Sequence, residues 1–305
     1  MNEKDLTELI RRMVETEIRT EEATAPPPPV NATAATVKRT PMAATPEDTR
    51  LAKKVANWLG TEIPPSHWFG NWRAAGDRAF YVSRTPARLA VGRAGPRYRT
   101  DTILDFLTDH AAARDAVHSM ILDDVLTELG VVRLHSAATT KKEFLARPDL
   151  GRKLDDEAAT IIAKAATRSP QVQIVAGDGL SATAINVNLR RILPPLEAHL
   201  RGQGIRVGTT FAIDNARVVA GDQVARQVDA DVLCMLVGER PGLKTAESMG
   251  AYVTYMKVDS FNEAMRSMVS NIHRGGLEPA TEGARQVAEL CLKALREKKT
   301  GIEWS

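Results

Sequence analysis

The sequence predicts an α/β fold: a Rossmann-like, mostly parallel sheet with flanking helices, preceded by a helical region and a detached N-terminal helix. Two observations lead to this class. From residue 172 onward, short apolar runs alternate with segments of helical spacing, which is the pattern of strand–helix–strand units. The first run, 172–176, also stops abruptly at Gly-Asp-Gly before a helical pattern begins. Strand ends of this kind are where open α/β sheets bind their ligands.

Composition narrows the classes of function. The 305 residues suffice for one large domain or two smaller ones, and 43% hydrophobic with 26% charged residues is ordinary for a globular protein. A net charge of +3, with Lys and Arg scattered, argues against a nucleic-acid partner. No apolar run reaches the roughly 18 residues of a membrane span, and the polar N-terminus does not resemble a secretory signal. The distant Cys234 and Cys291 favour buried thiols in a reducing cytoplasm.

Residues 1–23 and 24–45 differ from the rest of the chain. In 1–23 the apolar positions share one helical stripe, which consists of Leu6, Leu9, Ile10, Met13 and Val14. Residues 24–45 are rich in Ala, Thr and Pro, which is typical of an extended linker. Because a short isolated helix is marginal in water, we expect the stripe to bind a partner. The alternative is a disordered tail with accidental periodicity.

Residues 46–150 are expected to form the helical region. The predicted elements there are helices over 47–60, 101–113 and 114–129 and a strand over 131–135. Gly60 ends the first helix, and Thr100 is placed to cap the second.

Residues 151–305 are expected to form the Rossmann-like domain, and a helix over 149–167 leads into it. The predicted strands cover 172–176, 206–213, 231–237 and 251–258. The predicted helices cover 182–201, 222–230, 262–272 and 280–298.

Two turns at predicted strand ends carry polar groups. Residues 177–181, Gly-Asp-Gly-Leu-Ser, suit a phosphate, ribose or amide ligand, but equally a turn with a helix cap. Residues 238–242, Gly-Glu-Arg-Pro-Gly, place an acidic and a basic side chain at the ligand edge, which favours binding over a surface ion pair. His273 at a predicted helix end is either an acid/base group or a capping residue. The histidines have no metal-ligand spacing, and no nucleophile–His–Asp set is present.

Five short stretches occur together in an order and spacing typical of one family. They are Gly-Arg-Ala-Gly-Pro-Arg at 92–97, Arg-Pro-Asp-Leu-Gly-Arg at 147–152, Asp-Gly-Leu-Ser at 178–181, Val-Gly-Glu-Arg-Pro-Gly-Leu at 237–243 and Ser-Asn-Ile-His at 270–273. They resemble the small subunit, or light chain, of ethanolamine ammonia-lyase, an adenosylcobalamin-dependent lyase of ethanolamine degradation.

This resemblance implies a hetero-oligomer of two kinds of chain. The large subunit, a TIM barrel, binds ethanolamine and carries the catalytic residues, so none is expected in this chain. The small subunit helps hold the cobalt-containing cofactor for radical deamination of ethanolamine to acetaldehyde and ammonia. The resemblance places cobalamin contacts at Val218, Glu239 and Met268, and makes Arg217 a further donor to a cobalamin amide or phosphate. The family can have Cys where this chain has Met268, and Met suits apolar packing against the cofactor.

The resemblance also bears on the state of the cofactor and on location. No histidine lies in the D-x-H-x-x-G context of proteins that replace the cofactor's own base, so cobalamin is expected to bind with dimethylbenzimidazole on the cobalt. Residues 1–23 resemble the encapsulation sequences of bacterial microcompartment cargo. They predict a cytoplasmic enzyme inside such a compartment, docked to its shell or to other cargo.

Two other classes of function stay open. A stand-alone α/β nucleotide-binding enzyme needs a complete G-x-G-x-x-G, which Ala182 interrupts. A purely structural scaffold leaves Glu239 and Arg240 at a strand end without a role. Whether the chain is stable alone or needs a large partner separates these classes.

Overall fold

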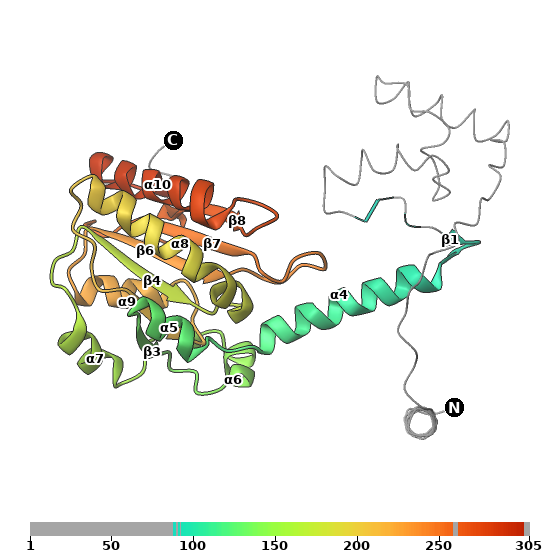
Figure 1. Ribbon diagram of the computed structural model, residues 1–305. Coiled ribbons are helices and arrows are strands. Elements are labelled where there is room, and N and C mark those ends of the chain that lie inside the picture. The colour runs from blue at the N-terminus through green and yellow to red at the C-terminus, as the bar shows by residue number, and fades with distance from the viewer. Residues whose placement is uncertain (1–87, 90, 92, 259–261, 302–305) are drawn as a thin grey trace, which may run out of the picture. The chain divides into compact units, whose positions relative to one another are not determined.

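A six-stranded sheet forms the centre of the protein in the computed structural model, which describes residues 88–89, 91, 93–258 and 262–301. The strand order is β3-β5-β4-β6-β7-β8 (Figure 1). The strands are β3 (Val132–His135), β4 (Val172–Gly177), β5 (Phe211–Asp214), β6 (Val232–Gly238), β7 (Met249–Tyr255) and β8 (Ser267–Ile272). The first four are parallel to one another, whereas β7 is antiparallel to β6 and β8 is antiparallel to β7. The predicted α/β class with a mostly parallel sheet is confirmed.

Helices form a layer on each face of this sheet (Figure 1). One layer contains α5 (Asp123–Leu129), α8 (Ala182–Gly202) and α10 (Ala284–Glu297), and the other contains α7 (Ala158–Ala165) and α9 (Ala220–Gln227). A hydrophobic core lies under each layer. Because β4 and β6 lie between both layers, every residue of these strands is buried. Their sequences are accordingly almost entirely apolar.

The other elements lie around the sheet. They are β1 (Arg93–Ala94), β2 (Arg97–Tyr98), α4 (Thr100–His118), α6 (Lys141–Ala146), η2 (Leu150–Arg152), η3 (Glu263–Met265) and η4 (Pro279–Gly283). The strand β3 belongs to the same sheet as the strands that follow residue 151.

The helix predicted over 262–272 is wrong. The chain forms η3 and then the edge strand β8, which pairs with β7. Apolar residues at 265, 268, 269 and 272 have helical spacing, which explains the prediction. The strand forms because β7 offers unpaired backbone groups, and because Val269 and Ile272 pack against the core under α10.

Other boundaries differ in smaller ways. The helix predicted over 149–167 is interrupted between η2 and α7, and α4 continues to His118 before α5 begins at Asp123. Thr100 is the first residue of α4, and no side chain caps that helix. The strand predicted over 206–213 forms only at Phe211–Asp214. The prediction missed α6, which Thr140 caps by accepting from the Glu143 amide.

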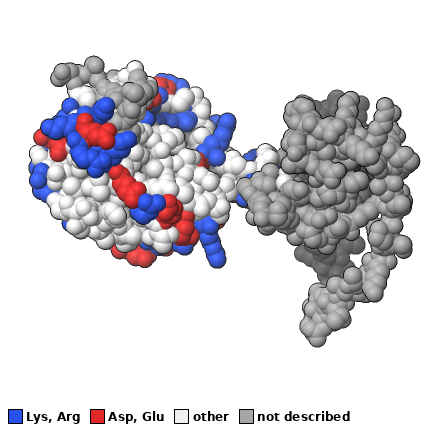
Figure 2. Space-filling view, turned by 90° about the horizontal axis from the view of Figure 1, so that it is seen from above, with Lys and Arg blue, Asp and Glu red and all other residues white. Residues whose placement is uncertain are grey.

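The predicted helices over 1–23 and 47–60 and the linker over 24–45 lie outside the described residues. Within the described ranges, no helix combines the length and apolarity needed to cross a membrane. On the face that Figure 2 shows, basic and acidic side chains of the described part are interspersed. Arg285 of α10, for example, pairs with both Glu282 and Glu289.

Candidate functional site

The turn after β4 uses its polar groups within the fold. The buried Asp178 carboxylate accepts from Lys141 Nζ at 2.7 Å and from the Ala216 amide at 2.9 Å. Ser181 caps α8 by accepting from the Ala184 amide at 3.1 Å. Of the two interpretations of this turn, the structure supports a turn with a helix cap.

The position between the ends of β4 and β5 is occupied by α6. The helices that follow these strands, α8 and α9, lie on opposite faces, an arrangement that opens a ligand crevice in many α/β sheets. Here Lys141 reaches in from α6 to Asp178 and to the Gly179 carbonyl, and the Phe144 ring is fully buried beside it. This crevice is therefore filled by the chain's own side chains.

Arg217 has no carboxylate partner among the described residues. Its amide donates to the Gly151 carbonyl at 2.7 Å, and its guanidinium carbon lies 4.5 Å from the centre of the Phe144 ring. The Nε atom is buried and has no hydrogen-bond partner. Burial and the nearby Arg152 lower the pKa of Arg217. An unpaired, partly buried guanidinium suits a carbonyl or phosphate oxygen supplied by another molecule.

Glu239 follows β6 directly, and two serine hydroxyls fix its carboxylate. Ser248 donates to Oε2 and Ser270 donates to Oε1, each at 2.5 Å. Gly250 leaves room for this arrangement, because a Cβ atom at that position would lie 2.9 Å from Oε1. An ionised carboxylate has about four acceptor positions, so Glu239 can still accept hydrogen bonds from a ligand.

Beside Glu239, the outer part of the sheet presents a surface that we call the open face: Gly250, Tyr252, Met268 and Ser270. Met268 lies directly opposite Tyr252 in the β7–β8 ladder, so the two side chains project from the same side of the sheet. On this side, α7 and α9 pack on β3, β4 and β6. Met268 remains 45% exposed. The open face therefore combines an exposed apolar side chain with a half-buried tyrosine.

Of the four residues predicted to bind the cofactor, the structure links Glu239 and Met268 and places Val218 on the same side of the sheet. Glu239 is joined through Ser270 to the open face that contains Met268. Val218, in the turn before α9, packs against the core on the side of the sheet to which Tyr252 belongs. Arg217 is next to Val218 in the chain, but its side chain lies against Phe144 instead.

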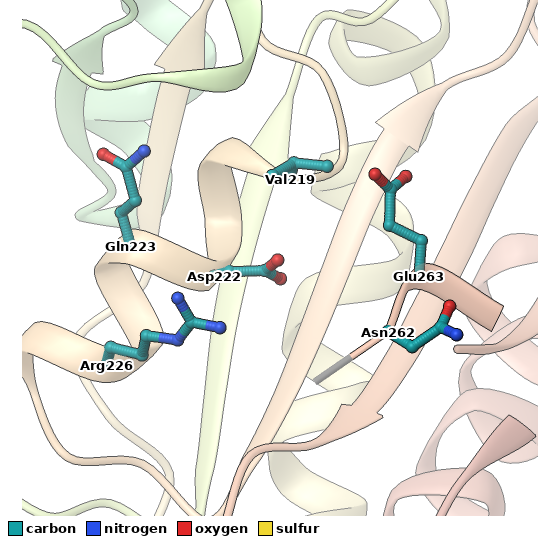
Figure 3. A pocket seen from close by; sticks show the side chains of 6 residues that line it. All are labelled: Val219, Asp222, Gln223, Arg226, Asn262 and Glu263. Carbon is teal, nitrogen blue, oxygen red and sulfur yellow. The ribbon is translucent and has the colours of Figure 1, made fainter. Parts of the chain in front are cut away.

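A cleft of about 430 Å³ lies between α9 and η3, in front of the sheet (Figure 3). Its lining residues are Val219, Asp222, Gln223, Arg226, Asn262 and Glu263. Several polar groups there are already engaged: Gln223 accepts from the Leu154 amide at 3.1 Å, and Glu263 pairs with Arg152.

A buried ion pair joins this cleft to the open face. The guanidinium of Arg266, just before β8, donates to both carboxylate oxygens of Asp222 on α9, at 2.8 and 2.7 Å. These side chains are only 6% and 4% exposed. The ion pair therefore fixes the edge strand relative to α9, and with it Met268 relative to Val218.

Sequence reasoning missed Ser248 and Tyr252 as parts of this site. Ser270 was present in one of the five stretches, but nothing indicated that it contacts Glu239. The sequence does contain one indication of Tyr252. Side chains along the strand 249–255 alternate between its two faces, so Tyr252 lies on the face opposite the core that contains Ala251 and Val253.

No group of three or more His, Cys, Asp or Glu side chains in the described ranges could hold a metal ion. His273 lies in the turn after β8, where its Nδ1 accepts from the Gly275 amide at 3.1 Å. Because residues 267–272 form a strand, His273 does not cap a helix as predicted, and its contact belongs to the turn after β8.

Most of the chain matches a known protein family. Residues 79–304 match the family model described as ethanolamine ammonia-lyase light chain (EutC). The chain is 44% identical over 230 residues to the ethanolamine ammonia-lyase small subunit of Listeria innocua, covering 74% of this chain and 78% of that protein. It is 47% identical over 221 residues to the protein of the same name in Lachnoclostridium phytofermentans, covering 72% and 74%. The corresponding protein of Clostridium tetani is 44% identical over 219 residues, again covering 72% and 74%.

Proposed function

Because the chain belongs to the ethanolamine ammonia-lyase light chain family, we propose that it is the small subunit of an adenosylcobalamin-dependent ethanolamine ammonia-lyase. In this proposal a large subunit, a TIM barrel, contributes the catalytic residues. The small subunit holds the cofactor against the large one, and the pair converts ethanolamine to acetaldehyde and ammonia. The open face beside Glu239 is the observation that supports the proposal, because it combines an exposed apolar side chain with carboxylate acceptor positions.

The residues of this region fit cobalamin. Met268 offers an apolar contact and Glu239 offers acceptor positions. Arg217, whose side chain lies against Phe144 and apart from this region, offers further donors that no described carboxylate neutralises. Val218, just before α9, is partly buried against the core on the same side of the sheet as the open face. Adenosylcobalamin, when bound, supplies the cobalt–carbon bond whose cleavage starts the radical chemistry.

The cleft of about 430 Å³ is lined by none of the four residues proposed to bind the cofactor, and cobalamin is much larger than the drug-sized ligands that occupy pockets of roughly 300–1,000 Å³. In this proposal the cofactor lies against the open face instead, and the large subunit provides the remainder of its site.

Co-expression tests the proposal most directly. We expect acetaldehyde formation from ethanolamine and adenosylcobalamin only when this chain and an ethanolamine ammonia-lyase large subunit are expressed together. Each chain alone is expected to be inactive. Absence of a complex and of activity, in an experiment where another small subunit restores activity to the same large subunit, contradicts the proposal.

We also propose that cobalamin binds with its own dimethylbenzimidazole on the cobalt, since the chain has no D-x-H-x-x-G. The electron paramagnetic resonance spectrum of bound cob(II)alamin tests this point. Dimethylbenzimidazole labelled with ¹⁵N at its coordinating atom is expected to change the superhyperfine splitting of the spectrum. An unchanged splitting, together with a change upon ¹⁵N-histidine labelling of the protein, is the opposite result.

A further inference from the structure

The Tyr252 hydroxyl has no assigned role so far, although its position at the site is unusual. The ring is half-buried and packs against the core on the side of α9. Among the described residues, none hydrogen-bonds the hydroxyl. The hydroxyl is not one of the buried polar atoms that lack a partner, so it is open to solvent and accessible to a polar group of another molecule.

Tyr252 and Glu239 lie next to each other on the open face. The Glu239 carboxylate lies over Gly250, and Gly250 and Tyr252 are two residues apart on β7, so they share a side of the sheet. Positions of this kind are separated by roughly 7 Å. Burial, together with the negative charge of Glu239, raises the pKa of Tyr252. The phenol therefore stays protonated at neutral pH and can donate a hydrogen bond.

A donor beside an acceptor matches one chemical group well. The ionised carboxylate of Glu239 only accepts, and the protonated hydroxyl of Tyr252 is available to donate. A primary carboxamide has the complementary pair, an N–H donor and a carbonyl acceptor on one planar group. Cobalamin carries such amides around its corrin ring.

We propose that Tyr252 and Glu239 together bind one peripheral carboxamide of the cofactor. The Tyr252 hydroxyl donates to the amide oxygen, and the Glu239 carboxylate accepts from the amide nitrogen. Ser248 and Ser270 hold the carboxylate in position and leave one acceptor site on each oxygen. This inference rests on the proposed function, because it names the part of cobalamin that the site recognises.

Binding of cyanocobalamin to the assembled complex of small and large subunits tests the inference without requiring turnover. Tyr252→Phe keeps the ring and removes only the hydroxyl, and we expect its Kd to rise about 3- to 10-fold, the worth of one hydrogen bond. Tyr255→Phe is the matched control, since Tyr255 packs against the core on the other face of the same strand, and its Kd should be unchanged. Melting curves and gel filtration establish that both variants fold and assemble.

A second probe identifies the amide. In cobalamin monocarboxylates, one peripheral carboxamide is replaced by a carboxylate, which cannot donate to Glu239 and is repelled by it. We expect one of these isomers to bind the wild-type complex much more weakly than cyanocobalamin does. Glu239→Gln should lower the Kd of that isomer at least tenfold relative to the wild-type complex, because the Gln amide can donate to the carboxylate. The other isomers should not gain affinity in this way.

The outcomes separate this inference from the proposed function. If the wild-type complex does not bind cyanocobalamin, the proposed function is wrong and the inference falls with it. If the wild-type complex binds cyanocobalamin, but Tyr252→Phe binds it equally well and Glu239→Gln rescues no monocarboxylate, only the inference is wrong.

Discussion

At the scale of single residues, the polar groups of this chain divide into those that stabilise the fold and those that remain available. From the sequence, Asp178 and Ser181 suit a ligand, but in the structure both make contacts within the chain. Asp178 accepts from Lys141, and Ser181 caps the N-terminus of α8. Glu239 and Arg217, by contrast, keep hydrogen-bonding capacity. A sequence does not reveal this difference, because the partners of Asp178 lie 37 and 38 residues away.

The Asp222–Arg266 ion pair leads to a prediction about stability. Asp222→Ala leaves a buried guanidinium without its carboxylate, and we expect the free energy of unfolding to fall by about 3–5 kcal/mol. Replacing both residues, with Asp222→Leu and Arg266→Met, should recover most of this loss because no buried charge remains. Urea unfolding followed by circular dichroism measures both effects. A loss of less than about 1 kcal/mol in Asp222→Ala would show that the pair is not needed to hold β8.

At the scale of elements, the central strands and the helices that cover them could be predicted from the sequence, whereas the edge strand β8 could not. β4 and β6 are continuous apolar runs between two helical layers, so their sequences indicate buried strands. β8 is buried on one side only, and its apolar positions at 265, 268, 269 and 272 equally fit a helix. Pairing with β7 decides the outcome, and that interaction is invisible in the local sequence.

We propose that the helical region 46–150 packs on the large subunit. Within this region, the helix α4 is the element best suited to make the contact. It exposes an apolar run in its N-terminal half that consists of Ile103, Leu104, Phe106 and Leu107. These side chains are 43%, 57%, 42% and 52% exposed, unusually high for large apolar residues in a cluster. Only Ala113 and Ala116, in the C-terminal half, are buried.

We therefore expect Leu104→Glu with Leu107→Glu to weaken assembly with the large subunit at least tenfold. The stability of the chain itself should change by no more than about 0.5 kcal/mol per substitution, since both side chains are already exposed. Ala112→Glu places one such charge on an exposed position of α4 outside the apolar run, and it should assemble normally. Affinity for the large subunit can be measured by biolayer interferometry. Equal affinities for the double variant and the wild type would place the interface elsewhere.

At the scale of the whole molecule, the chain combines a sheet domain with an N-terminal segment of different composition. We propose that residues 1–23 direct the enzyme into a bacterial microcompartment in the cytoplasm and that 24–45 connect them to the body. The argument is one of sequence: the stripe of Leu6, Leu9 and Met13 has no use in a soluble tail unless a partner covers it. In this proposal residues 24–45 act as the extended spacer that their Ala, Thr and Pro content predicts.

A fusion of residues 1–45 to a fluorescent protein tests this proposal in cells that form ethanolamine-using shells. We expect discrete fluorescent foci that coincide with a labelled shell protein. Leu9→Asp with Met13→Asp interrupts the stripe and should make the fluorescence diffuse, because an apolar face with two carboxylates no longer pairs with an apolar groove. Glu8→Gln changes the polar face and should leave the foci intact. Diffuse fluorescence of the unaltered fusion would contradict a targeting role, and foci that persist without shell proteins would indicate aggregation of the stripe with itself.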